Sequence, residues 1–238
     1  MFTNKNTPLF IAIIVADIFI VIGFLIKTPL IIGISIFLAV ITMMMGIVSR
    51  RMTHMWLTDD VRLWAREIRR FEQSDRKKLP SQNAVVFVGS STIRFWSTLA
   101  EDMSPLPIIQ RGFGGSRMLD SVHYADKIVI PYNPSAVVVF SGTNDISGKT
   151  PKSAEYVSSK FKEFCAVIHA SLPQTPIYFI SITPTPGRWK HWPTIQEANR
   201  LIEQYTDSDE HLHFIDTTSN FLDETGLPQR KLYRRDRI

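Results

Sequence analysis

The segment AVVFVGSS, residues 84–91, indicates the type of fold. Five consecutive apolar residues, three of them β-branched valines, end at a glycine and a pair of serines. A strand that is apolar on both faces is typical of a parallel sheet that is covered by helices on both sides. We therefore expect a buried strand here, with its carboxyl end at Gly89.

Other short apolar runs follow this one, and longer helical stretches separate them. The further runs are residues 107–110, 136–140, 177–182 and 212–216, and the helical stretches are 92–101, 118–130, 154–171 and 194–205. Strands that alternate with helices predict an α/β fold, here a three-layer α/β/α, flavodoxin-like arrangement around a parallel five-stranded sheet. In such sheets the chemistry lies at the carboxyl ends of the strands.

The composition is that of a globular chain with an added apolar segment. The 238 residues are 45% hydrophobic and 21% charged, with a formal net charge of +5. This apolar content excludes a disordered chain. A disulfide-stabilised scaffold is excluded as well, because Cys165 is the only cysteine.

Two apolar segments precede the sheet, at residues 9–26 and 30–48, and each approaches the roughly 20 apolar residues that a membrane helix needs. Pro29 is suited to the first position of the second helix, so we expect two transmembrane helices in a hairpin within residues 1–50. A cleaved signal peptide is not expected, because the apolar region consists of two long segments and no small-residue cleavage site follows. Asp17 is either a tolerated, protonated carboxyl or a functional polar contact.

Basic residues near the helix ends predict the orientation of the hairpin. Lys5, Arg50 and Arg51 lie at its two ends, and Lys27 alone lies in the turn. Basic residues favour the cytoplasmic side, so we expect the following domain to face the cytoplasm and the protein to be a multi-pass membrane protein.

Residues 51–82 are expected to form a juxtamembrane amphipathic helix and a linker. Its apolar positions recur at steps of three and four: Leu57, Val61, Trp64, Ile68 and Phe71. The arginines on its other face could bind anionic lipid headgroups, or the face could simply be solvated, since acidic residues dilute the charge. No nucleic-acid motif accompanies the basic residues, so nucleic acid is not an expected partner.

Small polar residues follow three of the strands. Residues 89–91 (GSS) place a hydroxyl at a helix start, as a nucleophile or only as a cap. Residues 111–116 (RGFGGS) let a backbone N–H approach a ligand, or form a flexible turn. Residues 142–145 (GTND) carry an amide that could donate to an oxyanion, or could form a capping turn.

These three blocks, in this order, resemble blocks I, II and III of the SGNH (GDSL-type) hydrolases. The likeness is greatest to the lysophospholipase- and platelet-activating-factor-acetylhydrolase-like branch, and it covers roughly residues 83–236. The resemblance implies an SGNH hydrolase domain at residues 83–238 that cleaves carboxylic esters. No cofactor is expected, and no metal, because no cluster of His, Cys and Asp has the spacing of metal ligands.

The resemblance also implies a role for individual residues. Ser91 would be the nucleophile, and the oxyanion hole would consist of the Ser91 N–H, the Gly115 N–H and the Asn144 side chain. Asp236 matches the aspartate of the family's last block, Asp-x-x-His, in which the aspartate orients the histidine that acts as the base.

The histidine of that block would be residue 239, whereas the sequence stops at Ile238. A serine hydroxyl is a poor nucleophile without a base, so we expect the chain as given to be inactive or weak. We interpret it as a truncated product or an incomplete reading frame of an active hydrolase. His191, in the loop after the fourth strand, is a minor alternative for the base.

Aromatic residues near the strand ends are candidates for the substrate site. We expect Phe113, Trp189 and His191 to line it, although such aromatics can equally belong to the core. The expected partners are the lipid bilayer and a small-molecule ester, lipid-derived or an acetylated sugar. Two other functions stay open: a catalytically impaired pseudo-hydrolase that is a membrane-tethered binding module, and a flavodoxin-like nucleotide-binding domain.

Overall fold

The computed structural model describes residues 29–148 and 150–233. The chain divides into two compact units, residues 1–58 and residues 59–238, which are described separately. The first predicted membrane helix, Asp17 and the turn before Pro29 lie outside the described residues, as does Asp236.

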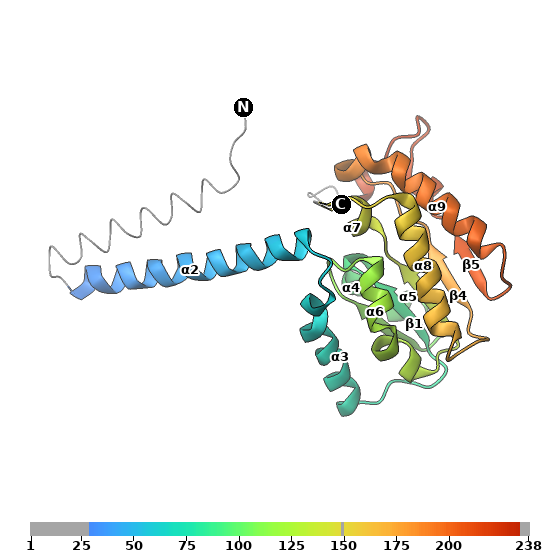
Figure 1. Ribbon diagram of the computed structural model, residues 1–238, viewed down its shortest axis with the longest axis horizontal. Helices are drawn as coiled ribbons and strands as arrows, with labels where there is room; N and C mark the ends of the chain where they lie inside the picture. Colours follow the sequence, from blue (N-terminus) through green and yellow to red (C-terminus); the bar gives the residue numbers. More distant parts are fainter. Residues whose placement is uncertain (1–28, 149, 234–238) are drawn as a thin grey trace. The chain divides into compact units, whose positions relative to one another are not determined.

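Among the described residues of the first unit, one helix, α2 (Pro29–Leu57), begins at the proline expected to start it (Figure 1). It runs past the predicted end at Val48, because no glycine or proline interrupts it there, and Leu57 belongs to it rather than to the amphipathic helix. Within α2, residues 33–51 are long and apolar enough to cross a membrane, and they are almost wholly exposed. This is the only such helix among the described residues, so the predicted pair is unconfirmed.

The second unit contains the predicted parallel sheet. Its five strands are β1 (Val85–Gly89), β2 (Ile108–Gly112), β3 (Ala136–Phe140), β4 (Ile177–Ile180) and β5 (Leu212–Ile215). They lie in the order β2-β1-β3-β4-β5, and every neighbouring pair is parallel (Figure 1). The sequence prediction of a parallel five-stranded sheet is therefore confirmed.

Helices cover both faces of the sheet. One face carries α6 (Met118–Ile128), α8 (Ala154–His169) and α9 (Trp192–Thr206), and α3 (Ala65–Lys77) packs beside α6 (Figure 1). The other face carries two short helices, α4 (Ser91–Phe95) and α5 (Leu99–Asp102), whose Ile93 and Leu99 pack with Phe87 and Phe140. The remaining elements are α7 (Thr143–Ile146) and the 3₁₀ helices η1 (Val61–Trp64), η2 (Ile130–Tyr132), η3 (Pro186–His191), η4 (Thr218–Phe221) and η5 (Arg230–Leu232).

The prediction of a single helix at residues 92–101 is wrong. Helix α4 ends before Trp96, and a second helix, α5, begins at Leu99. Gln110 of β2 donates side-chain hydrogen bonds to the carbonyl oxygens of Ile93, at 2.5 Å, and of Trp96, at 3.0 Å. Carbonyls at a helix end have few partners within the helix, and here the following backbone gives each of them one 3.3 Å hydrogen bond, from the N–H of Trp96 or Leu99. A side chain from a neighbouring strand therefore stabilises an end that the local sequence does not signal.

Candidate active site

The carboxyl ends of three strands meet at one edge of the sheet. Gly89 at the end of β1 pairs with Gly112 of β2 on one side and with Phe140 of β3 on the other. The three polar segments that follow these strands therefore start side by side.

Ser91 is the first residue of α4 and is partly exposed. It lines a cavity of about 360 Å³, so its side chain is not enclosed in the core. The other described residues of the wall are Ser90, Thr92, Ile93, Trp96, Phe140, Thr143, Ile180, Thr183, Thr185, Arg188, Thr217, Phe221, Leu232 and Tyr233. A hydroxyl in a mainly apolar hollow is suited to attack a bound small molecule.

The segment after β2 packs directly on α4. A Cβ atom at Gly112 would lie 2.2 Å from the Arg94 backbone nitrogen, so only glycine allows this approach. A Cβ at Gly114 would lie 3.8 Å from the Ser91 Cβ, which places this segment next to Ser91. Gly115 has a φ of +91°, a conformation that favours glycine.

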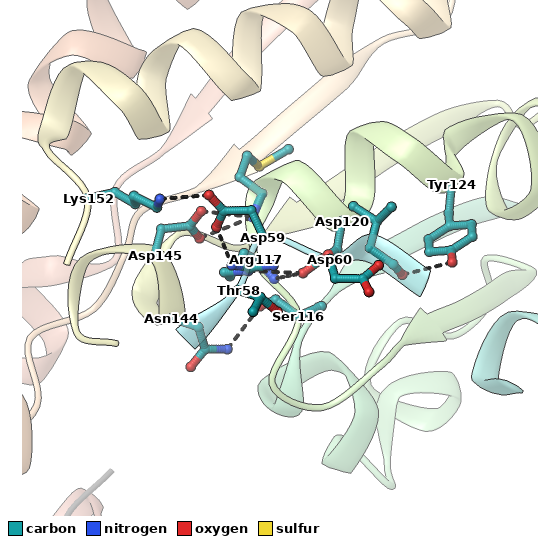
Figure 2. A network of polar contacts seen from close by, with 12 residues as sticks. Thr58, Asp59, Asp60, Ser116, Arg117, Asp120, Tyr124, Asn144, Asp145 and Lys152 are labelled. Carbon is teal, nitrogen blue, oxygen red and sulfur yellow. Dashed lines mark hydrogen bonds and ion pairs between the residues drawn. The ribbon is translucent and has the colours of Figure 1, made fainter. Parts of the chain in front are cut away.

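The segment after β3 holds the segment after β2 at two points. Asn144 donates from Nδ2 to the Ser116 carbonyl oxygen at 2.9 Å. The Asp145 carboxylate accepts a hydrogen bond from the Met118 backbone N–H at 3.0 Å, at the start of α6. Figure 2 shows both contacts within one polar network. Asn144 and Asp145 are both buried, so their hydrogen bonds hold residues 116–118 from the side of the protein interior.

Two backbone donors near Ser91 are unoccupied. Within the described part of the chain, neither the Ser91 N–H nor the Gly115 N–H has a hydrogen-bond partner. The described contacts use one of the two amide hydrogens of Asn144. Free N–H groups beside a hydroxyl are the elements from which an oxyanion site is made.

Charged residues form a network around Arg117, which directly follows Ser116. Arg117 contacts Asp120 through Nε at 3.4 Å and Asp59 through Nη1 at 2.5 Å, and Lys152 contacts Asp59 at 2.9 Å (Figure 2). The Lys152 hydrogen bond and the two cations lower the pKa of Asp59. Asp59 thus joins the first residues of the second unit to the segment that contains Gly115.

The buried carboxyls of this network have raised pKa values. Burial raises the pKa of Asp145 to about 7, and the nearby Asp120 adds to the effect against the hydrogen bond from Met118. Burial also raises the pKa of Asp120, which accepts from the Arg117 backbone N–H at 2.8 Å. Asp145 belongs to the motif at residues 142–145, but the sequence alone assigns it no role, because a local pattern does not predict burial.

The expected substrate-lining residues are placed differently. Phe113 is fully buried and packs edge-on against Trp64, with ring centroids 5.7 Å apart, so the expectation that it lines the substrate site is corrected. Trp189 stacks on Trp192. Neither Trp189 nor His191 is among the described residues of the cavity wall. The neighbouring Arg188 lines the wall instead.

His191 is also a poor match to the properties of a base. Burial lowers its pKa, and Lys190 and Arg188 lower it further. The wall instead includes Leu232 and Tyr233, and the Tyr233 hydroxyl donates to the Pro184 carbonyl oxygen. No local pattern could have predicted Leu232 and Tyr233 as wall residues, because both are far from Ser91 along the chain.

Comparison with known proteins identifies this arrangement. A sequence profile of the GDSL-like lipase/acylhydrolase family matches residues 86–238. The chain belongs to the GDSL-like lipase/acylhydrolase family. All three polar segments of this GDSL-like chain lie within the matched range. No curated protein sequence matches the chain.

Solved structures share the fold of the GDSL-like domain. A Bacteroides fragilis protein assigned as an acylhydrolase has a TM-score of 0.63 and 20% identity, over 76% of this chain and 88% of that one. A GDSL-like lipase from Bacteroides thetaiotaomicron has a TM-score of 0.62 and 20% identity, over 72% and 87%. A variant of an acetyl-xylooligosaccharide esterase from Geobacillus has a TM-score of 0.52 and 13% identity, over 68% and 88%.

Proposed function

We propose that this protein is a membrane-anchored serine esterase that cleaves carboxylic ester bonds, with Ser91 as its nucleophile. Membership of the acylhydrolase family supports ester hydrolysis in general. The observation that carries the assignment to Ser91 is its position on a cavity wall, next to Gly114 and near two unoccupied backbone N–H groups.

In the proposed reaction the Ser91 hydroxyl oxygen attacks the ester carbonyl carbon, and its proton passes to a base. The N–H groups of Ser91 and Gly115 and the Asn144 amide stabilise the negative charge on the carbonyl oxygen. The tetrahedral intermediate then expels the alcohol, which takes up the proton, and leaves an acyl group on Ser91. Water hydrolyses this acyl-enzyme and regenerates the serine.

The base in this proposal is a histidine that follows Asp236 at the spacing of the family's last block, and Asp236 orients it. Tyr233, three residues before Asp236, supports this placement. It lies on the cavity wall, and its hydroxyl donates a hydrogen bond to the Pro184 carbonyl oxygen. The acid–base pair would then reach the same cavity as Ser91.

The cavity favours a short acyl group. Its volume of about 360 Å³ is near the lower end of the range for small-molecule sites, roughly 300 to 1,000 Å³. Ile93, Trp96 and Ile180 provide apolar wall area, and Thr183 and Arg188 provide polar groups. We propose esters of short acids as substrates, either acetylated sugars or lipid-derived esters.

The membrane part of the proposal rests on α2. Its apolar, exposed stretch of residues 33–51 supports an anchor by length and composition. We further propose that residues 9–26 form a second membrane helix and that the basic residues at the ends of the hairpin keep the esterase domain on the cytoplasmic side.

Hydrolysis of p-nitrophenyl acetate tests the nucleophile, in a chain that continues through the proposed histidine. Ser91→Ala should abolish turnover, since losing the nucleophile leaves only the contributions of binding and the oxyanion hole. Ser90→Ala removes the neighbouring hydroxyl as the matched control and should retain a measurable rate. Retained turnover in Ser91→Ala, or loss only in Ser90→Ala, would place the nucleophile elsewhere.

A further inference from the structure

Helix α3 turns one defined face toward the esterase domain. Trp64, just before it, and Ile68 within it are buried. About two helical turns further on, the Asp75 carboxylate forms an ion pair with Arg111 of β2 at 2.6 Å. These inward contacts fix which side of α3 faces away from the domain.

The outward side of α3 and η1 is mainly basic. Its exposed residues are Arg62, Arg66, Arg69, Arg70, Gln73, Ser74, Arg76 and Lys77. We call these residues the basic face. No acidic residue and no aromatic residue lies among them.

The acidic residues of α3 do not neutralise the basic face as a whole. Asp75 is used by Arg111, and Glu72 pairs with Lys127 of α6 at 3.8 Å. Glu67 pairs only with Arg70, and Asp60 pairs with Arg62. Within the described residues, four charged members of the basic face have no ion pair: Arg66, Arg69, Arg76 and Lys77.

The chain keeps the basic face close to the end of the apolar helix. Four residues lie between Leu57, the last residue of α2, and Arg62, which makes five residue steps, and an extended chain spans at most about 3.6 Å per step. The first arginine therefore lies within roughly 18 Å of the end of α2, whatever the arrangement of the two units.

We propose that the basic face of α3 docks on an anionic membrane surface and binds the phosphate groups of lipid headgroups. The proposal rests on the proposed membrane anchor, which keeps the face near the bilayer. Guanidinium groups match phosphate oxygens with two parallel hydrogen bonds, and basic residues beside a membrane are drawn to anionic lipid. A membrane is favoured over single-stranded nucleic acid because the face offers no aromatic ring on which a base could stack.

Docking can be measured on the full chain in vesicles, with a fluorophore on the basic face. Gln73→Cys gives a selective attachment site, since the only native cysteine, Cys165, is buried. Headgroup-linked quencher lipid reports contact in vesicles of phosphatidylcholine alone, or of phosphatidylcholine and phosphatidylglycerol in equal parts. We expect stronger quenching with phosphatidylglycerol, and loss of the difference in about 1 M NaCl, where the Debye length is about 3 Å.

Charge variants identify the groups responsible. Arg66→Gln with Arg69→Gln should weaken the lipid-dependent contact by about tenfold or more, because each basic residue near an anionic surface contributes a factor of about five. Lys162→Gln with Arg200→Gln removes two charges from α8 and α9 and should leave the contact unchanged. A fluorophore at Glu210→Cys, which is exposed just before β5, should show no lipid dependence.

Three results would overturn the proposal. Equal quenching at residue 73 in both lipids would mean that no anionic surface is recognised. An increase with phosphatidylglycerol at residue 210 as large as that at residue 73 would mean that the contact is not specific to α3. Tighter binding of a short RNA than of anionic vesicles would reassign the basic face. Release of the chain from vesicles by alkaline carbonate would instead show that the anchor itself is absent.

Discussion

Asn144 and Ser116 join the segments that follow β3 and β2 through a single buried hydrogen bond. The Asn144 Nδ2 donates to the Ser116 carbonyl oxygen at 2.9 Å, one residue after Gly115. The same amide group that is proposed to stabilise an oxyanion therefore also holds the neighbouring backbone donor in place.

In the chain that continues through the proposed histidine, Asn144→Ala should lower kcat for p-nitrophenyl acetate by about 10²- to 10³-fold with little change in KM, as expected when an oxyanion donor is removed. Steady-state kinetics test this, and thermal unfolding of the same variant separates catalysis from folding. A lowered Tm with kcat intact would assign Asn144 a structural role only.

Asp145 should make the protein less stable as the pH rises. Its folded-state carboxyl keeps a proton up to a pKa of about 7, whereas the unfolded chain releases it near 3.8. The folded state binds more protons between these values, so the free energy of unfolding should fall from about pH 4 to pH 7, by up to about 4 kcal/mol, and then level off.

Asp145→Asn keeps an acceptor for the Met118 N–H and removes this titration. Urea unfolding at a series of pH values should give a flatter profile for Asp145→Asn than for the parent chain, and Asp207→Asn, at an exposed carboxyl, should keep the parent profile. An unchanged slope in Asp145→Asn would mean that the buried carboxyl does not titrate in this range.

Gly112→Ala and Gly114→Ala should differ sharply in stability. The added methyl at residue 112 meets the Arg94 backbone nitrogen at 2.2 Å, and α4 with Ser91 must move to make room. Overpacking of this kind costs about 3 kcal/mol, or a fall in Tm of about 6–12 °C for a domain of this size.

At residue 114 the same methyl meets the flexible Arg94 side chain at 3.4 Å and lies at ordinary contact distance, 3.8 Å, from the Ser91 Cβ. Differential scanning calorimetry of both variants tests the contrast. Equal values of Tm would contradict the close packing of α4 on the end of β2.

Phe113 should act as a core residue and not as a substrate contact. Phe113→Ala is expected to destabilise the domain by about 3–5 kcal/mol. A double-mutant cycle with Trp64→Ala should give a coupling energy of about 0.5–1.5 kcal/mol for the edge-on ring pair. Coupling near zero would mean that η1 does not pack on the segment after β2.

The sequence alone was sufficient for the sheet and for the edge at which the polar segments gather. Runs such as residues 84–88 and 136–140 are apolar on both faces, and a glycine or a small polar residue ends each of them. These signals are local, because strand formation and the turn after a strand depend on neighbouring residues in the chain. Ser91, Gly115 and Asn144 could therefore be assigned to one edge of the sheet from the sequence alone.

Tertiary packing, and not the local sequence, determines which side chains face the cavity and which are buried. Phe113 lies one residue from the polar edge, yet its ring is enclosed because Trp64, far away in the chain, covers it. Asp145 follows Asn144 directly, yet burial beside Asp120 raises its pKa to about 7. Burial depends on contacts between distant segments, and no local pattern of residues encodes those contacts.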